Sequence, residues 1–287
     1  MLDEKQNIKN VSNFALCCYV PYSFDMFAHE NNYFSSFHGL LWKYFLETNY
    51  HLRLFKKTHK INNCVVTGYP KLDTYLENKK INKKMIWPVF KIKKIKRIIY
   101  APHHSFTPTP LTLSTFNWNG NAILEMARNS LNTIWVFKPH PNLKYNYIQT
   151  YPNKKKEIEK YFKQWRTLKN AKIYTQGDYF DLFKTSDALI TDCGSFLAEY
   201  LFTKKPILHL RTKLQNRPFN KIGKKIIENY YQIYNLDELK NIFNRVILDN
   251  DDYLKKKRLA SIKELGIDYS MSSAKKITKH FEEILKI

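Results

Sequence analysis

The sequence contains no long apolar run and few cysteines. None of its apolar runs approaches the roughly 18 residues that a membrane-spanning helix needs, so we expect no transmembrane helix. Polar and charged residues follow Met1, so no secretory signal is predicted. The four cysteines, Cys17, Cys18, Cys64 and Cys193, form no Cys-x-x-Cys pair. This spacing favours reduced thiols, as in a cytoplasmic protein.

Patterns that would bind a metal ion are also missing. The segments that we single out below contain no Asp-x-Asp pair and no His/Cys cluster at the spacing of metal ligands. The acidic run at 249–252 is interpreted as a turn between two helices. We therefore expect neither a metal ion nor a cofactor.

Acidic residues are scarce beside basic ones. The chain has 48 Lys and Arg against 25 Asp and Glu, which gives a formal net charge of +23. Such a surface attracts nucleic acid, anionic lipid or a phosphate-rich polymer, although codon bias in an AT-rich genome explains part of the lysine excess. No RNP, KH or zinc-knuckle pattern supports specific nucleic-acid binding. We expect the basic stretches 79–97 and 255–258 to face an anionic membrane surface.

From residue 97 onward, short apolar runs alternate with helical patterns. Strands are expected at 97–101, 133–138, 172–175, 188–191, 207–210 and 231–233. Helices are expected at 120–132, 144–168, 178–185 and 195–203, and two or three more within 236–286. At 287 residues the chain can form one large domain or two of ordinary size. The alternation predicts an α/β fold with a parallel sheet covered on both faces.

Before residue 97 the pattern is less regular. Strands are expected at 14–20 and 65–67, and the spacing of apolar residues over 36–57 predicts a helix. A short helix is expected at 72–76. The basic segment 79–97 is interpreted as an exposed connection.

Polar motifs follow the strands of the predicted sheet. His103 and His104 follow the first strand, His140 the second, and Thr175 with Gln176 the third. In parallel sheets, ligands bind beyond the carboxyl ends of the strands. We therefore expect these motifs to converge on one crevice.

The fourth strand end carries a small Gly-Ser pair where strand turns into helix. The backbone N–H groups of Gly194 and Ser195 and the positive end of the helix dipole would favour a phosphate. Glu199 lies one turn further on, within reach of a hydroxyl beside that phosphate. Asp192 is interpreted mainly as an acceptor of backbone N–H bonds. Cys193 could be an activated nucleophile at the helix N-terminus, but we favour a passive role.

Four segments, in this order, resemble the CDP-glycerol glycerophosphotransferase family, the polymerases of teichoic-acid-like polymers. The segments are Gly68–Asp73, Tyr100–Pro102, His140–Pro141 and Ser186–Ser195, the last followed by Lys204–Pro206. Gly194 stands where the family usually has a serine. The match runs from about residue 65 to 210.

The resemblance implies a GT-B fold, in which two Rossmann-like domains face each other across a cleft. Residues 1–60 would be a remnant of the acceptor-side domain with a bridging helix, and 61–287 a complete, doubly wound donor-binding domain. The implied function is a transferase that moves a polyol phosphate from a CDP-activated donor to a lipid-linked polysaccharide or teichoic-acid-like acceptor, at the inner face of the bacterial plasma membrane. One alternative is a sugar-nucleotide glycosyltransferase of capsule or lipopolysaccharide synthesis. Another is a truncated, non-catalytic domain that binds nucleotide or polyanions.

The resemblance also implies catalytic roles. His140 would contact the donor pyrophosphate or protonate the leaving phosphate, because an imidazole titrates near neutral pH. Ser195 and Gly194 would bind phosphate oxygens. His103 or His104 would supply positive charge where the family often has arginine. The alternatives are that His140 caps a strand and that His103 and His104 are solvated.

The remaining donor contacts concern the nucleoside. Glu199 would bind a ribose hydroxyl, and the alternative is an ordinary exposed helix acid. Thr175 and Gln176 would line the base pocket.

Overall fold

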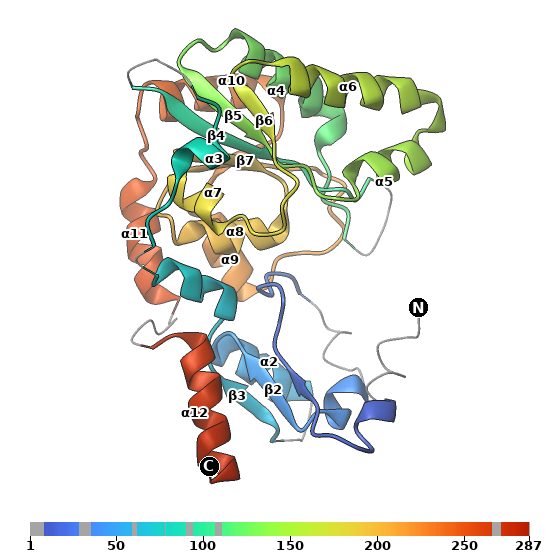
Figure 1. The fold of residues 1–287 in the computed structure, drawn as a ribbon, viewed down its shortest axis with the longest axis vertical. Coiled ribbons are helices and arrows are strands. Elements are labelled where there is room, and N and C mark those ends of the chain that lie inside the picture. Colours follow the sequence, from blue (N-terminus) through green and yellow to red (C-terminus); the bar gives the residue numbers. More distant parts are fainter. Residues whose placement is uncertain are drawn as a thin grey trace.

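The computed structural model describes residues 9–28, 36–58, 62–77, 79–89, 94–106, 111–265 and 271–286. These residues form two parallel sheets with their own helices, arranged one above the other along the long axis of the molecule (Figure 1). We call them the large unit and the small unit.

The large unit is built on six parallel strands in the order β6-β5-β4-β7-β8-β9. Their bounds are β4 (Lys96–Ala101), β5 (Thr133–Phe137), β6 (Ala171–Ile173), β7 (Ala188–Thr191), β8 (Ile207–Leu210) and β9 (Tyr231–Ile233). In chain order this arrangement is 3-2-1-4-5-6, that of a doubly wound nucleotide-binding sheet. Such a sheet binds ligands where its strand order reverses, which here is between β4 and β7.

Helices cover both faces of this sheet, as the sequence predicts. One face carries α4 (Phe116–Asn129), α5 (Leu143–Thr150), η4 (Pro152–Lys154), α6 (Lys155–Thr167), α10 (Leu236–Ile242) and η5 (Phe243–Leu248). The other carries α7 (Phe180–Thr185), α8 (Gly194–Leu201) and α9 (Lys221–Ile227). Successive strand residues alternate between the two apolar cores: Ile98 and Tyr100 face the first set, Ile99 and Ala101 the second.

Two helices of the large unit differ from the prediction. The helix expected at 144–168 is divided into α5 and α6, because Pro152 lacks the N–H that a continuous helix would need. Helix α4 begins four residues before residue 120, at Phe116. The bounds of β8 and β9 agree with the prediction.

The small unit contains a three-stranded parallel sheet. Its strands are β1 (Cys18–Tyr19), β2 (Lys43–Leu46) and β3 (Cys64–Val66), beside η2 (Ser36–Leu40) and α2 (Asn49–Thr58). The helix expected over 36–57 is therefore wrong in its first half. Leu41 and Phe45 have helical spacing, but pairing with β3 places Phe45 in a strand. The strand expected at 14–20 is confined to β1.

Helix α12 (Ser273–Leu285) returns from the large unit to the small one (Figure 1). Phe281 stacks on Trp42 with ring centroids 5.8 Å apart. The carboxylate of Asp73 in η3 (Pro70–Tyr75) accepts the N–H of Ser273 at the start of the helix, at 2.7 Å. Because β3 pairs with β2, we propose a unit boundary after Val66 instead of at residue 60, with α12 assigned to the small unit.

The basic segment 79–97 is more than an exposed connection. It contains α3 (Lys83–Ile86), and both Ile86 and Trp87 are buried. The Trp87 indole N–H donates to Thr185 Oγ1 at 2.8 Å. The segment therefore packs against α7, while α11 (Lys255–Glu264) lies further along the same unit. None of the helices in the described ranges combines the length and apolar character needed to cross a membrane.

Candidate active site

Asp192 joins the carboxyl ends of β4 and β7. Its carboxylate accepts the backbone N–H of His103 at 2.6 Å, and both the N–H and the hydroxyl of Thr115 at 2.7 Å. Burial raises the pKa of Asp192 to about 6, although these hydrogen bonds oppose the shift. Asp192 therefore accepts backbone N–H bonds, as predicted, but not at the start of the helix that follows it, where we expected them. The donors belong to the loop after β4 and the start of α4.

Three histidines gather beside this junction. Ring centroids are 4.4 Å apart for His103 and His104, 3.9 Å for His104 and His140, and 5.4 Å for His103 and His140. One side-chain nitrogen of each lies within 4.8 Å of the others. The motifs after β4 and β5 therefore meet, as expected from their positions at strand ends. We call these three residues the histidine cluster.

The tautomer of His103 follows from its hydrogen bonds. Its Nδ1 lies 3.3 Å from the backbone nitrogen of Ser105 and 2.8 Å from the Ser105 hydroxyl. That hydroxyl accepts the N–H of Leu113 at 2.9 Å, so its own hydrogen is free for His103. A ring nitrogen that accepts hydrogen bonds carries no proton. We therefore assign the proton of neutral His103 to Nε2.

The other two histidines have the same arrangement. Nδ1 of His140 accepts the backbone N–H of Asn142 at 3.1 Å. Nδ1 of His104 lies 2.7 Å from the side-chain nitrogen of Asn146, which also donates to the carbonyl oxygen of His104. Among the described residues no hydrogen bond involves these Nε2 atoms, so each neutral ring would have an Nε2–H available to donate. The cluster suits an electron-rich partner such as a phosphate oxygen.

Burial keeps the cluster uncharged. It lowers the pKa of His103 to about 3 and the pKa of His140 to about 4, with further lowering by neighbouring rings and, for His140, by Lys138. Burial also lowers the pKa of His104. The expectations that His140 titrates near neutral pH and that His103 or His104 supplies positive charge are therefore wrong for the free protein. Neutral imidazoles can still polarise a substrate oxygen as N–H donors.

Among the described residues, these three histidines are the group close enough to hold a metal ion. The hydrogen bonds argue against that use. A metal-bound histidine normally donates its second ring N–H to an acceptor. Here Nδ1 of His103 and Nδ1 of His140 each face a backbone N–H group. A backbone N–H can only donate a hydrogen bond, so neither Nδ1 can donate to it. The donor set fits an anion better than a metal ion.

Lys138 supplies a positive charge near the histidine cluster. The sequence had led us to expect that charge from His103 or His104. It directly follows β5 and is 8% exposed. Its ammonium donates to the Gln176 carbonyl at 3.1 Å and lies 5.3 and 5.1 Å from the ring centroids of Tyr174 and Tyr179. Within the described part of the chain, no carboxylate pairs with it. A lysine directly after a buried strand was the signal that could have identified it.

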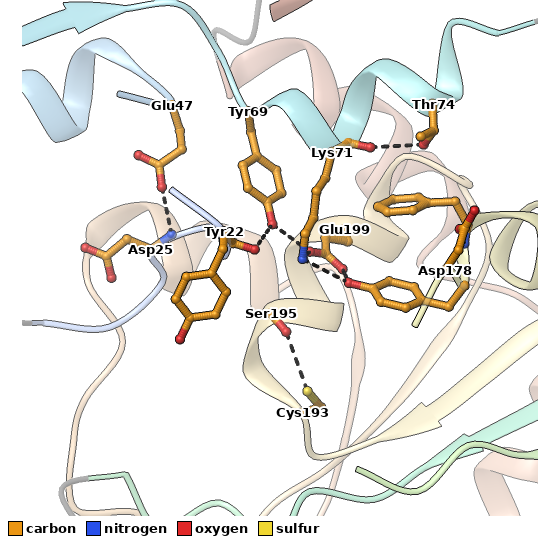
Figure 2. Close-up of polar contacts among 12 residues, drawn as sticks. Tyr22, Asp25, Glu47, Tyr69, Lys71, Thr74, Asp178, Cys193, Ser195 and Glu199 are labelled. Carbon is orange, nitrogen blue, oxygen red and sulfur yellow. Dashed lines mark hydrogen bonds and ion pairs between the residues drawn. The ribbon is translucent and has the colours of Figure 1, made fainter. Parts of the chain in front are cut away.

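Glu199 is fully buried, so the interpretation as an exposed helix acid is wrong. Oε1 accepts the Tyr69 hydroxyl at 2.7 Å, Oε2 accepts the Tyr179 hydroxyl at 2.6 Å, and the Lys71 ammonium lies 3.5 Å from Oε1 (Figure 2). Burial raises the pKa of Glu199, and Lys71 opposes the shift. A ribose hydroxyl would have to replace one of the tyrosine hydroxyls.

The same contact connects the two units. The Tyr69 hydroxyl has one hydrogen but two acceptors in range, Glu199 Oε1 and the Tyr22 carbonyl at 3.0 Å (Figure 2). A protonated Glu199 would satisfy both by donating to Tyr69, which then donates to Tyr22. Tyr69 belongs to the Gly-Tyr-Pro segment that the sequence pattern singles out. The pattern does not indicate that Tyr69 contacts Glu199.

The Gly-Ser turn is covered by an aromatic ring. A Cβ on Gly194 would lie 2.6 Å from the ring of Phe27, so any larger residue here would displace that ring. Burial raises the pKa of the Cys193 thiol to about 11, which excludes an activated thiolate and agrees with the passive role. Ser195 Oγ lies 3.6 Å from the Cys193 sulfur.

The proposed base-pocket residues do not line an enclosed pocket in the described structure. Thr175 and Gln176 are exposed after β6. Gln176 reaches the site through its carbonyl oxygen, which accepts from Lys138.

The fold resembles solved nucleotide-using enzymes at low sequence identity. The wall teichoic acid polymerase TagF aligns with 95% of this chain and 69% of its own, at 13% identity and a TM-score of 0.59. The S. aureus MnaA–UDP co-structure aligns over 96% and 71%, at 15% identity and a TM-score of 0.58. UDP-GlcNAc 2-epimerase from Neisseria meningitidis bound to UDP-GlcNAc aligns over 95% and 70%, at 18% identity and 0.55. These similarities establish the GT-B-type α/β fold.

Sequence comparison identifies the family. No curated protein matches the chain by sequence. Residues 33–216, well over half of the chain, match the family described as CDP-Glycerol:Poly(glycerophosphate) glycerophosphotransferase. That range includes β4, β5 and β7 with the histidine cluster, Lys138 and Glu199. The chain is a member of the CDP-glycerol:poly(glycerophosphate) glycerophosphotransferase family.

Proposed function

We propose that this chain transfers a glycerol-phosphate-like group from a CDP-activated donor to a teichoic-acid-like or other cell-surface polysaccharide acceptor. The observation that carries the proposal is the histidine cluster. Three N–H donors lie beyond the carboxyl ends of β4 and β5, next to the β4–β7 position where the strand order of the sheet reverses, and near the Lys138 ammonium. Family membership supports the same reaction.

The reaction breaks the bond between the β-phosphorus of the donor and the oxygen that bridges it to CMP. The acceptor hydroxyl attacks the β-phosphorus, and CMP leaves. Negative charge on the phosphate oxygens must be stabilised by donors already in position. His140 and Lys138 would bind the bridging and terminal oxygens. His103 and His104 would add N–H donors, and Ser195 with the N–H of Gly194 would complete the phosphate site.

The nucleoside would extend toward α8 and the end of β6. Glu199 would bind the ribose after the Tyr179 hydroxyl moves away, and Thr175 and Gln176 would border the base. This arrangement predicts that donor binding changes the environment of Tyr179. Tyrosine fluorescence or chemical shift with and without CDP would detect it.

A second candidate is supported by the fold similarity to UDP-GlcNAc 2-epimerase. A sugar-nucleotide glycosyltransferase would leave both phosphates on the nucleotide. The test is to incubate the protein and acceptor with CDP-glycerol, UDP-sugars and GDP-sugars, and to identify the nucleotide released. CMP supports phosphotransfer, whereas an intact nucleoside diphosphate rejects it. Nucleotide binding without turnover would favour a non-catalytic domain.

We further propose that the basic surface holds the protein at the anionic inner face of the plasma membrane. Within the basic stretch 255–258, Arg258 cannot contribute to this surface, because it is fully buried and pairs with Asp252. Lys255 and Lys256 remain exposed. Binding to anionic vesicles should weaken as salt rises, because exposed charges act over about 8 Å at physiological ionic strength. Equal binding to neutral vesicles would reject this proposal.

A further inference from the structure

A basic cavity lies outside the crevice, beyond the carboxyl ends of β8 and β9. Its volume is about 450 Å³, and its lining includes Arg211, Lys213, Lys224, Phe219 and Tyr234. Arg211 directly follows β8, and its N–H donates to the carbonyl oxygen of Ile233 in β9 at 2.8 Å. The cavity therefore opens at the same edge of the sheet as the histidine cluster.

The cavity concentrates positive charge. No aspartate or glutamate is among its lining residues. In the described part of the chain, no carboxylate lies within ion-pair distance of Arg211, Lys213 or Lys224. A surface that collects cations without acidic partners attracts anions, and the planar guanidinium of arginine is suited to phosphate.

Arg211 is held in place by neutral groups. Its guanidinium carbon lies 5.4 Å from the ring centroid of Phe219 and 5.7 Å from that of Tyr234. Nη1 donates to the side-chain oxygen of Gln232 at 2.6 Å, while the buried Nε has no acceptor among the residues that the structure describes. The side chain is therefore positioned before any ligand arrives, which lowers the entropic cost of binding.

Aromatic packing connects the cavity to the candidate active site. Phe219 stacks on Phe27 with ring centroids 4.9 Å apart, and Phe27 covers Gly194 at the start of α8. Neighbouring strands lie about 4.8 Å apart, so the β8–β9 edge is about 10 Å from the β4–β7 edge. An extended chain whose end lay in the crevice could pass over Phe219 into the cavity.

We propose that this cavity binds a phosphodiester of the acceptor chain. This phosphodiester is already part of the chain and is set back from the terminal hydroxyl that attacks the donor. The proposal rests on the proposed function, because a polyol-phosphate acceptor carries such groups at regular intervals. A polysaccharide without phosphate would have no use for the site. The cavity would thus favour acceptors that already carry polyol phosphate.

The test uses a fluorescent synthetic oligomer of glycerol phosphate as the probe, with CDP titrated separately by calorimetry. The double variant Arg211→Gln/Lys224→Gln should bind the oligomer about tenfold more weakly or worse, because charge-assisted hydrogen bonds to phosphate are lost. Its CDP affinity should be unchanged. Lys255→Gln/Lys256→Gln removes the same charge from α11 and should change oligomer binding less than twofold.

Several outcomes would overturn the proposal. Equal losses in the two double variants would show that only net charge matters. A loss of CDP affinity in the cavity variant would make the cavity part of the donor site. Loss of binding to anionic vesicles with unchanged oligomer binding would assign it to lipid headgroups, and inorganic phosphate competing as well as the oligomer would assign it to free phosphate. Absence of CMP release by the unmodified protein, with oligomer binding still dependent on Arg211, would instead count against the proposed function.

Discussion

The two sheets differ in how far each could stand alone. In the large unit every residue of β5, β7 and β8 is buried, and helices cover both faces. In the small unit β1 and β3 contain no buried residue, and the segments on either side of β1 expose Phe14 at 91% and Tyr22 at 75%. The small unit depends for its burial on α12 and on contacts with the large unit.

The two units also differ in what they contribute to the candidate active site. The histidine cluster, Lys138 and Asp192 are positioned entirely by the large sheet. The small unit contributes near Glu199, through the Tyr22 carbonyl that accepts from Tyr69, and at Gly223 and Gly194, through Met26 and Phe27. Changes at these junctions should therefore affect the coupling of the units before they affect the crevice.

The largest effect is expected for Glu199→Ala. Removing the carboxylate takes away the acceptor of the Tyr179 hydroxyl and the charge partner of the Lys71 ammonium, and leaves the buried Tyr69 hydroxyl with the Tyr22 carbonyl as its acceptor. We expect a loss of about 3 kcal/mol in the free energy of unfolding, measured by urea denaturation. We also expect weaker nucleotide binding. Glu228→Ala, which removes an exposed glutamate paired with Lys257, is the control and should cost little. Equal stability of the two variants would show that Glu199 does not couple the units.

A smaller loss is expected for Gly223→Ala. A Cβ at this position would lie 2.1 Å from the carbonyl oxygen of Met26, a backbone atom that cannot rotate away. We expect a cost of about 2 kcal/mol, although alanine would otherwise stabilise a helix. Gly177→Ala is the matched control, because no atom lies within 4 Å of its added Cβ. If Gly223→Ala were as stable as the control, the close packing of Met26 on α9 would be refuted.

His140→Ala should leave the fold intact and reduce turnover. Loss of one charge-assisted phosphate contact removes about 1.5–3 kcal/mol, so the rate should fall at least about tenfold. Ser195→Ala should act in the same direction. His280→Ala, in α12 of the small unit, should leave turnover unchanged. Normal turnover with normal thermal unfolding in His140→Ala would mean that this histidine only shapes its loop.

A change of pH is expected to alter stability through contributions that oppose each other. His103 and His140 have pKa values of about 3 and 4 in the fold, below the unfolded value of about 6.5. Their stabilisation is present above pH 6.5 and is lost as pH falls toward 4. The raised pKa of Asp192, about 6, acts in the opposite direction. Stability should therefore fall between pH 6.5 and 4, because the two histidines outweigh the one aspartate. Replacing both histidines by asparagine should reverse the slope, and an unchanged slope would contradict the uncharged state assigned to these histidines.

The sequence predicted the large sheet well and the small one poorly, for a physical reason. Buried parallel strands such as β7 and β8 are continuous apolar runs with clear ends. The residues around Phe45 satisfy helical spacing as well as a short strand, and only pairing with β3 decides between them. The burial of Trp87 was not predicted, because this residue lies in a basic stretch that we expected to be exposed.

The candidate site was predictable in position but not in charge. Strand-end motifs led to the histidine cluster because parallel strands share an edge. Burial, which makes His103 neutral and raises the pKa of Glu199, depends on the folded surroundings and is not encoded in spacing. Tyr69 was inside a recognised family segment and Lys138 at the end of a predicted strand, but their contacts required the fold.

Calorimetric binding of CDP compared with cytidine tests the central claim most directly, because the two ligands differ only in the phosphates. We predict that the unmodified protein binds CDP more tightly than cytidine. This advantage should fall at least about tenfold in both His140→Ala and Lys138→Met, while cytidine affinity stays the same. An advantage for CDP that persists in both variants would contradict the assignment of the phosphate site to the histidine cluster and Lys138.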